Sequence, residues 1–237
     1  MQWTPPIDPA QDDLEPLLAS QGRTADWLNT DDGDPYGPSN VARWSSHQVA
    51  KQIPLRYRAA HPQEPEVRTW IADLIDRAAA EQTRRKAPVA SVTAGPSLLL
   101  LGPTGVGKTY EAYGAMRELA VTGTVARWVV VTAADLYAQL QPRHGIDSEA
   151  EFQRYAKAPI LLVDDLGAGG KISEFTESIN FRLVNHRYEN ELPTLITSNV
   201  LPKDLAARLG DRVTSRLAEM CRRVVITGQD RRRAMAA

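Results

Sequence analysis

The chain has 237 residues, 43% of them hydrophobic, and its 28 Lys and Arg against 29 Asp and Glu give a net charge of −1. A chain of this length and composition can form one good-sized hydrophobic core, or one core with a small appendage. Its single cysteine excludes an intrachain disulfide. The sequence has no apolar run near the roughly 20 residues of a spanning helix and no secretory signal at its start, so we expect a globular, cytoplasmic protein without a membrane segment.

The first 52 residues differ in character from the rest of the chain. Up to residue 40 they contain eight acidic residues against Arg23 alone, set among several prolines and glycines. Trp3, Trp27 and Trp44 are too far apart for one helical stripe, and aromatic residues among acids and prolines often dock on a partner. We therefore predict a partner-binding or flexible segment over residues 1–52 and a core over residues 53–237. A small helical cap folded onto the core is the alternative.

The rest of the chain alternates between helical and extended patterns. Pro65 begins a helical pattern with Val67, Trp70, Leu74 and Ala78 on one face. Short apolar segments predict five strands, over residues 97–102, 126–132, 159–167, 193–199 and 222–227. Helical segments lie between them, over residues 109–119, 133–140, 173–190 and 201–220. Continuous apolar strands separated by helices predict an α/β fold, with a five-stranded parallel sheet between helices.

A glycine-rich loop follows the first predicted strand. It has the pattern G-x-x-x-x-G-K-T between a strand and a helix, which is the context of a phosphate-binding loop. The glycines let backbone amides point inward, and the positive end of the following helix favours anions. Lys108 is expected to contact the outer phosphates, and the Thr109 hydroxyl to bind Mg²⁺. The predicted nucleotide-binding residues are Gly102, Pro103, Thr104, Gly105, Val106, Gly107, Lys108, Thr109 and Tyr110.

Polar residues end two of the later strands. Asp164 and Asp165 follow the apolar run of the third strand, and Asn199 ends the fourth. Adjacent carboxylates repel unless a cation lies near, so Asp164 is expected to bind Mg²⁺. Asp165 is expected to accept the proton of an attacking water, and Asn199 to orient that water. Glu is the commoner base at this position, and the shorter Asp predicts slow hydrolysis. Together with the loop, these residues predict a nucleoside triphosphate site.

Several segments of the core resemble the DnaC/IstB family of AAA+ ATPases, in the initiator and helicase-loader clade. They are residues 181–200, 209–220 and 224–232, preceded by the similar segment IPLRYRAA at residues 53–60, and the resemblance covers roughly residues 53–233. It implies an ATPase that uses ATP and Mg²⁺, self-assembles on single-stranded DNA and delivers a replicative helicase. In the transposition branch of the family the partner is a transposase. The acidic head does not match the amino-terminal domain of that branch, which favours replication.

The resemblance also implies that each nucleotide is completed by an arginine of the next subunit. Arg216 is the first candidate and Arg212 the second, one helical turn apart. The family's Gly-x-Asp-aromatic-Arg ending occurs at residues 228–232 with Arg231 in place of the aromatic residue, and Arg232 is the candidate nucleotide sensor. The length that remains after the fourth strand leaves no room for a separate helical lid, so nucleotide affinity is expected to be modest and to depend on the neighbouring subunit.

The residues that contact DNA are less well specified. Arg143, His144, Lys157 and Lys171 could follow a nucleic-acid backbone, or could equally be surface charge. A P-loop kinase acting on a small molecule is the hypothesis from another class, but it needs a substrate lid and a proton-accepting acid, and the sequence contains no such insertion. A DNA-binding module with a vestigial loop is disfavoured because the loop, both acids and the asparagine are intact.

Overall fold

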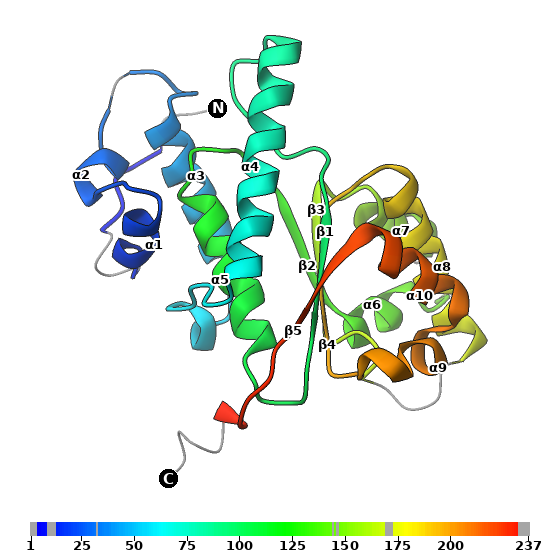
Figure 1. Cartoon of the computed structure of the whole chain (residues 1–237). Helices are drawn as coiled ribbons and strands as arrows, with labels where there is room; N and C mark the ends of the chain where they lie inside the picture. Colours follow the sequence, from blue (N-terminus) through cyan, green and yellow to red (C-terminus); the bar gives the residue numbers. More distant parts are fainter. Residues whose placement is uncertain are drawn as a thin grey trace. The chain divides into compact units, whose positions relative to one another are not determined.

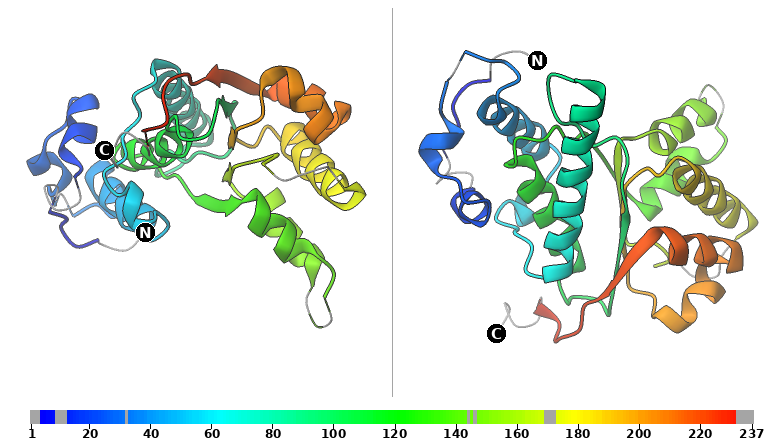
Figure 2. Two further views of the ribbon diagram at one scale, coloured as in Figure 1. Left: turned by 90° about the horizontal axis from the view of Figure 1, so that it is seen from below. Right: turned by 45° about the horizontal axis from the view of Figure 1, so that its top comes forward.

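The computed structural model describes residues 4–8, 13–31, 33–143, 145, 147–168 and 173–231. The chain forms two compact units (Figures 1 and 2). Unit 1 comprises residues 1–93 and 110–128, and unit 2 comprises residues 94–109 and 129–237. Among the described residues, no helix is long and apolar enough to cross a membrane.

A five-stranded parallel sheet forms the framework of unit 2. Its strands are β1 (Ser97–Leu101), β2 (Trp128–Thr132), β3 (Ile160–Asp164), β4 (Thr194–Ser198) and β5 (Cys221–Val225). They lie in the order β2-β3-β4-β1-β5, and β1 pairs in parallel with both β4 and β5. Every residue of β1 and β4 is buried, as expected of central strands in a parallel sheet. The predicted α/β fold is therefore confirmed.

The helices of unit 2 lie on one side of this sheet (Figure 1). They are α6 (Ala133–Leu140), α7 (Ser148–Ala156), α8 (Glu174–Glu189), the 3-10 turn η2 (Pro202–Asp204), α9 (Leu205–Leu209) and α10 (Asp211–Met220). Their apolar side chains join those of the strands in one core, which includes Leu99, Leu136, Leu161, Leu183 and Leu217. Burial of this common face holds the helices against the sheet.

Helix α7 has no counterpart among the predicted elements. The Asp147 side chain accepts hydrogen bonds from the amides of Glu149 and Ala150, both at 3.0 Å, and so caps its first turn. Phe152 and Tyr155 are buried in the core of unit 2. The helix has only nine residues, so its apolar pattern is too short to separate it from a loop in the sequence.

Arg187 of α8 is a buried cation within unit 2. Its side chain is 1% exposed and donates to the Thr194 hydroxyl at 2.7 Å, to the carbonyl of Pro193 at 2.7 Å and to that of Ala158 at 2.8 Å. A further bond reaches the Tyr155 carbonyl at 3.0 Å. Burial lowers the pKa of Arg187 to about 9, so the guanidinium stays charged at neutral pH. Its N–H groups donate to backbone carbonyls that directly precede β3 and β4, and these hydrogen bonds offset the loss of hydration.

Cys221, the single cysteine, begins β5 and is buried in the core of unit 2. Burial raises the pKa of its thiol to about 12, and the nearby charge of Arg223 lowers that pKa only in part. The thiol is therefore protonated at neutral pH and packs as a small apolar group.

The described part of the head is folded within unit 1. It forms α1 (Glu15–Ser20), α2 (Ala25–Leu28) and α3 (Pro38–Ala50). Leu17, Leu18, Leu28 and Ala42 form a small core with Val121, which follows α5 (Lys108–Ala120). The partner-docking role of the head, its helical-cap alternative and a boundary after residue 52 stay predictions. Trp3 lies outside the described residues.

A buried arginine ties together the polar segments of the head. Arg43 is 2% exposed and donates to the carbonyls of Thr4 at 3.1 Å, Leu28 at 2.7 Å and Thr30 at 2.9 Å. It also contacts the Asn40 side chain at 3.3 Å. These bonds link the first described residues to α2 and α3 and provide donors for backbone carbonyls in the interior of the head.

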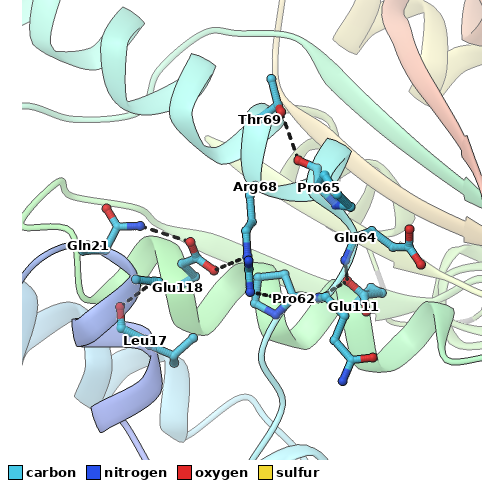
Figure 3. A network of polar contacts seen from close by, with 11 residues as sticks. Leu17, Gln21, Pro62, Glu64, Pro65, Arg68, Thr69, Glu111 and Glu118 are labelled. Carbon is cyan, nitrogen blue, oxygen red and sulfur yellow. Dashed lines mark hydrogen bonds and ion pairs between the residues drawn. The ribbon is translucent and has the colours of Figure 1, made fainter.

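The remaining elements of unit 1 are η1 (Leu55–Tyr57) and α4 (Pro65–Arg85), and two buried carboxylates of α5 contact the segment before α4 and the first turn of α4 itself (Figure 3). Glu111 accepts the backbone amides of Gln63 at 2.9 Å and Glu64 at 3.2 Å, directly before α4. Glu118 accepts from the Gln21 side chain at 3.0 Å and lies 3.9 Å from Arg68. A carboxylate at a helix start is favourable because it meets the positive end of the helix dipole.

The contact between this segment and α5 is close. A Cβ built on Gly114 would lie 2.6 Å from the carbonyl carbon of His61 and from the Pro62 nitrogen, so a glycine is needed there. The rings of Tyr57 and Tyr113 stack with their centroids 5.0 Å apart. The segment resembling the family's pre-core sequence therefore packs directly on this helix.

The first prediction concerns Glu118. Burial raises the pKa of this carboxyl, and the charge of Arg68 only partly opposes the effect. Between the ordinary pKa of the unfolded chain and the raised pKa of the folded state, the folded protein holds a proton on Glu118 that the unfolded chain has released. The stability that this protonated carboxyl contributes is therefore lost as pH rises through the folded pKa. Urea unfolding should show Glu118→Gln gaining stability relative to wild type between pH 5 and pH 7.5.

Asp76→Asn, at an exposed position of α4, is the charge-matched control and should show no such trend. A pH-independent difference between Glu118→Gln and wild type would contradict the assignment.

Candidate functional site

The predicted phosphate loop joins β1 to α5. Gly102, Gly105 and Gly107 all have positive φ, at 153°, 86° and 110°. A Cβ on Gly102 would lie 2.2 Å from the carbonyl oxygen of Ile226, so a side chain cannot be placed there. Glycine adopts this backbone without a steric penalty, which explains why the loop needs three of them.

Lys108 lies at the base of this loop. Its side chain is buried, and Nζ donates to the carbonyls of Gly102 at 2.9 Å and Pro103 at 2.8 Å. These bonds hold the ammonium inside the loop, next to the first turn of α5. The loop amides, the helix end and this cation together favour an anionic ligand.

The Thr109 hydroxyl lies against the Asp164 carboxylate. It donates to Oδ1 at 3.0 Å, with Oδ2 at 3.3 Å. Parallel pairing of β1 with β4 and of β4 with β3 brings the carboxyl ends of all three strands to one edge of the sheet, where these side chains meet. The structure therefore brings together the two residues that the sequence predicted as Mg²⁺ ligands.

Thr197 of β4 is a site residue that the sequence analysis missed. Its hydroxyl donates to Asp164 Oδ1 at 2.6 Å and accepts the backbone amide of Asp165 at 2.8 Å. The Thr197 carbonyl accepts the amide of Leu166 at 2.8 Å. A fully buried threonine thus fixes both acids at the end of β3. The only sequence signal was a polar pair, Thr197 and Ser198, at the end of an apolar strand.

Asp165 is exposed and has a left-handed backbone, with φ 61°. Asp and Asn tolerate this conformation better than most side chains. The residue begins a turn after β3, and the hydrogen bond from its amide to Thr197 holds that turn in place. The base predicted from the sequence is therefore accessible to solvent at the sheet edge.

Asn199 directly follows β4 and is half-buried. Within the described part of the chain, its side chain has no hydrogen-bond partner. Its amide can therefore serve a ligand or a water at the same sheet edge, as the sequence predicted, and that role stays a prediction.

The arginines predicted to act between subunits lie on α10. The Arg212 guanidinium lies 3.6 Å from the centroid of the Phe181 ring, and that of Arg216 lies 4.6 Å from Tyr188. Arg216 also lies 3.5 Å from the Glu219 carboxylate. These contacts with aromatic rings of α8 hold both cations at accessible positions of unit 2.

The remaining predicted residues are Tyr110, the candidate DNA contacts and the candidate nucleotide sensor. Tyr110, in unit 1, donates its hydroxyl to the carbonyl of Ala59 at 3.0 Å and lies 3.2 Å from the His61 ring nitrogen. Arg143 donates to the carbonyl of Ala138, and Lys157 is exposed. Arg232, the predicted nucleotide sensor, lies outside the described residues, as do His144 and Lys171.

Comparison with known proteins now identifies the family. Residues 73–235 match the model of the IstB-like ATP-binding proteins. The chain belongs to this family. A relative, the replicative helicase loader DnaI of Bacillus subtilis (strain 168), is 29% identical over 113 residues, which are 47% of this chain and 35% of that protein. The chain thus spans about a third of that curated relative.

Solved structures show that the chain shares, over most of its length, the fold of two proteins, DnaC and DnaI. The DnaC helicase loader superposes with a TM-score of 0.58 at 24% identity, covering 73% of this chain and all of that one. DnaI superposes with a TM-score of 0.51 at 24% identity, covering 73% of this chain and 96% of that one. Membership of an ATP-binding family agrees with the loop geometry described above, and the resemblance seen in the sequence is confirmed.

The second prediction concerns Thr197. Thr197→Val keeps the side-chain volume but removes the hydroxyl that donates to Asp164. Losing a hydrogen bond to a charged group costs about 1.5–3 kcal/mol, so the Mg²⁺-dependent affinity for ATP should fall roughly 10-fold or more. Titration of a fluorescent ATP analogue over a range of Mg²⁺ concentrations measures this.

Thr197→Ser, which retains the hydroxyl, is the matched control and should bind close to wild type. If the Val and Ser variants bind equally well, the Thr197 hydroxyl does not position the acid.

Proposed function

We propose that this chain is an ATP-dependent DNA replication protein of the DnaC type, which hydrolyses ATP, binds single-stranded DNA and loads a replicative helicase. The observation that carries the ATP part is the 3.0 Å contact between Thr109 and Asp164 beside the lysine-bearing loop. The likeness to the DnaI helicase loader supports the replication part.

In the proposed site, different residues bind the phosphates, orient the attacking water and accept its proton. The loop amides and Lys108 hold the phosphates, and the half-buried Asn199 amide orients the attacking water. Asp165 accepts the proton of that water, since it is an accessible carboxylate at the same edge as Asp164.

The site fits Mg²⁺ as the metal. Thr109 and Asp164 supply a hydroxyl and a carboxylate, the hard oxygen ligands that this ion prefers, and one or two protein ligands are usual because water and phosphate supply the rest. When bound, Mg²⁺ neutralises charge that develops on the phosphates. Thr197 keeps the Asp164 carboxylate aimed at the Thr109 hydroxyl.

Hydrolysis is proposed to depend on self-assembly. An arginine of a neighbouring copy, Arg216 or otherwise Arg212, would reach the terminal phosphate, and such arginines contribute roughly 10³ to 10⁵ in rate. Arg216 is suited to this because its side chain is 37% exposed. Assembly would then switch on turnover of an otherwise slow ATPase.

A loading assay tests the whole proposal. The replicative helicase of the same genome is incubated with circular single-stranded DNA, with or without this protein and ATP, and DNA-bound helicase is measured. Loading should require both, and Lys108→Ala should not support it. A protein that leaves loading unchanged but stimulates the transposase of a neighbouring gene would instead be a transposition helper.

The third prediction concerns Asp165. Asp165→Asn fits the same space and the same left-handed backbone, but cannot accept a proton. ATP should still bind with wild-type affinity, while steady-state hydrolysis should fall by roughly 10² or more. Turnover equal to wild type would place the base elsewhere.

The fourth prediction concerns Arg216. Arg216→Ala should bind ATP normally as a monomer and lose DNA-stimulated hydrolysis, because its target lies on the adjacent subunit. Mixing it with Asp165→Asn should restore part of the activity, since one copy then supplies the arginine and the other the base.

Arg182→Ala is the matched control. Arg182 also lies over an aromatic ring, 4.1 Å from the Phe152 centroid, and pairs with Glu149 at 2.8 Å. Its loss should leave DNA-stimulated hydrolysis intact. The absence of rescue in the mixture would argue that Arg216 acts within its own chain.

A further inference from the structure

After β5 the chain runs alongside the phosphate loop. Ile226 donates its amide to the carbonyl of Leu101 at 2.7 Å, and its own carbonyl lies over Gly102. Five residues later, Arg231 donates its amide to the carbonyl of Gly105 at 3.0 Å. We name residues 226–231 the carboxyl-terminal strap, because they follow the loop from its first glycine onward.

The strap places a carboxylate directly on the loop. A Cβ built on Gly105 would lie 1.9 Å from Oδ1 and 2.3 Å from Cγ of Asp230, so this carboxyl group packs against the glycine itself. A Cβ on Gly107 would likewise lie 3.1 Å from an Nη of Arg231. Two adjacent strap residues of opposite charge thus lie along a loop suited to an anion.

These two charges respond in opposite ways to a bound nucleotide. Without nucleotide, the loop amides and the helix end attract a carboxylate. Once phosphates are present, the Asp230 carboxylate lies among like charges, whereas the Arg231 guanidinium is attracted to them. In the family's Gly-x-Asp-aromatic-Arg ending, Asp230 occupies the Asp position and Arg231 replaces the aromatic residue, so the cation beside the carboxylate belongs to this chain's own strap.

We propose that Asp230 is an internal competitor of the nucleotide for the phosphate loop, and that Arg231 is a phosphate-binding cation of the same strap. The proposal rests on the ATP binding proposed above. Before nucleotide binds, Asp230 holds the strap on the loop, and phosphate entry displaces the carboxylate while Arg231 stays. The position of the carboxyl-terminal strap is then coupled to nucleotide occupancy.

The test compares nucleotide affinities by titration with fluorescent ATP and ADP analogues. Asp230→Asn keeps the shape of the side chain and removes its charge, so it should bind ATP 3- to 30-fold more tightly than wild type. The gain should be smaller for ADP, which carries less negative charge. Arg231→Gln should weaken ATP binding by a similar factor. If both residues only stabilised the fold, the two substitutions would not be expected to change ATP affinity in opposite directions.

Asp204→Asn, at an exposed position of η2, makes the same charge change away from the strap and should leave both affinities unchanged. Amide hydrogen exchange without nucleotide gives a second measurement. The Arg231 amide should be protected in wild type, through its bond to Gly105, and should exchange faster in Asp230→Asn.

The outcomes separate this proposal from the proposed function. Unchanged or weaker ATP binding by Asp230→Asn, in a wild-type protein that binds ATP, overturns the competition and leaves ATP binding standing. Absence of ATP binding by wild type overturns both. Slow exchange of the Arg231 amide in Asp230→Asn as well as in wild type would overturn the proposal that Asp230 holds the strap on the loop.

Discussion

The arrangement of the sheet edge in unit 2 depends on the buried guanidinium of Arg187. Its donors reach the carbonyl of Ala158 just before β3 and that of Pro193 just before β4, so one side chain of α8 fixes where both strands begin. Because strands rise by a fixed amount per residue, their starts also determine their ends. A slip of one residue would turn every side chain of a strand to the other face. Asp164 would then no longer meet Thr109.

Residues that belong to a local sequence pattern could be predicted from the sequence. Residues whose role depends on a contact between segments far apart in the chain could not. The loop, Lys108 and Asp164 follow from their neighbours along the chain. Thr197 matters only because β4 lies beside β3 and its hydroxyl reaches Asp164. Asp230 lies 125 positions from Gly105, and no periodicity connects them. The head escaped detailed prediction because α1 and α2 have six and four residues and depend on tertiary contacts.

The helix that begins with Lys108 and Thr109 carries further buried charges, from Glu111 in its first turn to Arg117 in its last. Glu111 binds the amides just before α4, and Arg117 donates to the carbonyls of Ala60 at 2.6 Å and Asp13 at 2.8 Å. Charged side chains are rarely this buried unless they have such partners. The segment before α4 therefore packs on α5 through hydrogen bonds as well as through apolar contacts. The predicted phosphate loop leads directly into this helix.

The buried thiol of Cys221 has a practical consequence. With a pKa of about 12 it offers almost no thiolate at neutral pH, and alkylating dyes react with thiolates. The wild-type chain should therefore take up little maleimide label while folded. A cysteine introduced at an exposed position would be the single reactive site, without any need to replace the native residue. Distances and motions within unit 2 thus become measurable by fluorescence in a protein whose core is left as it is.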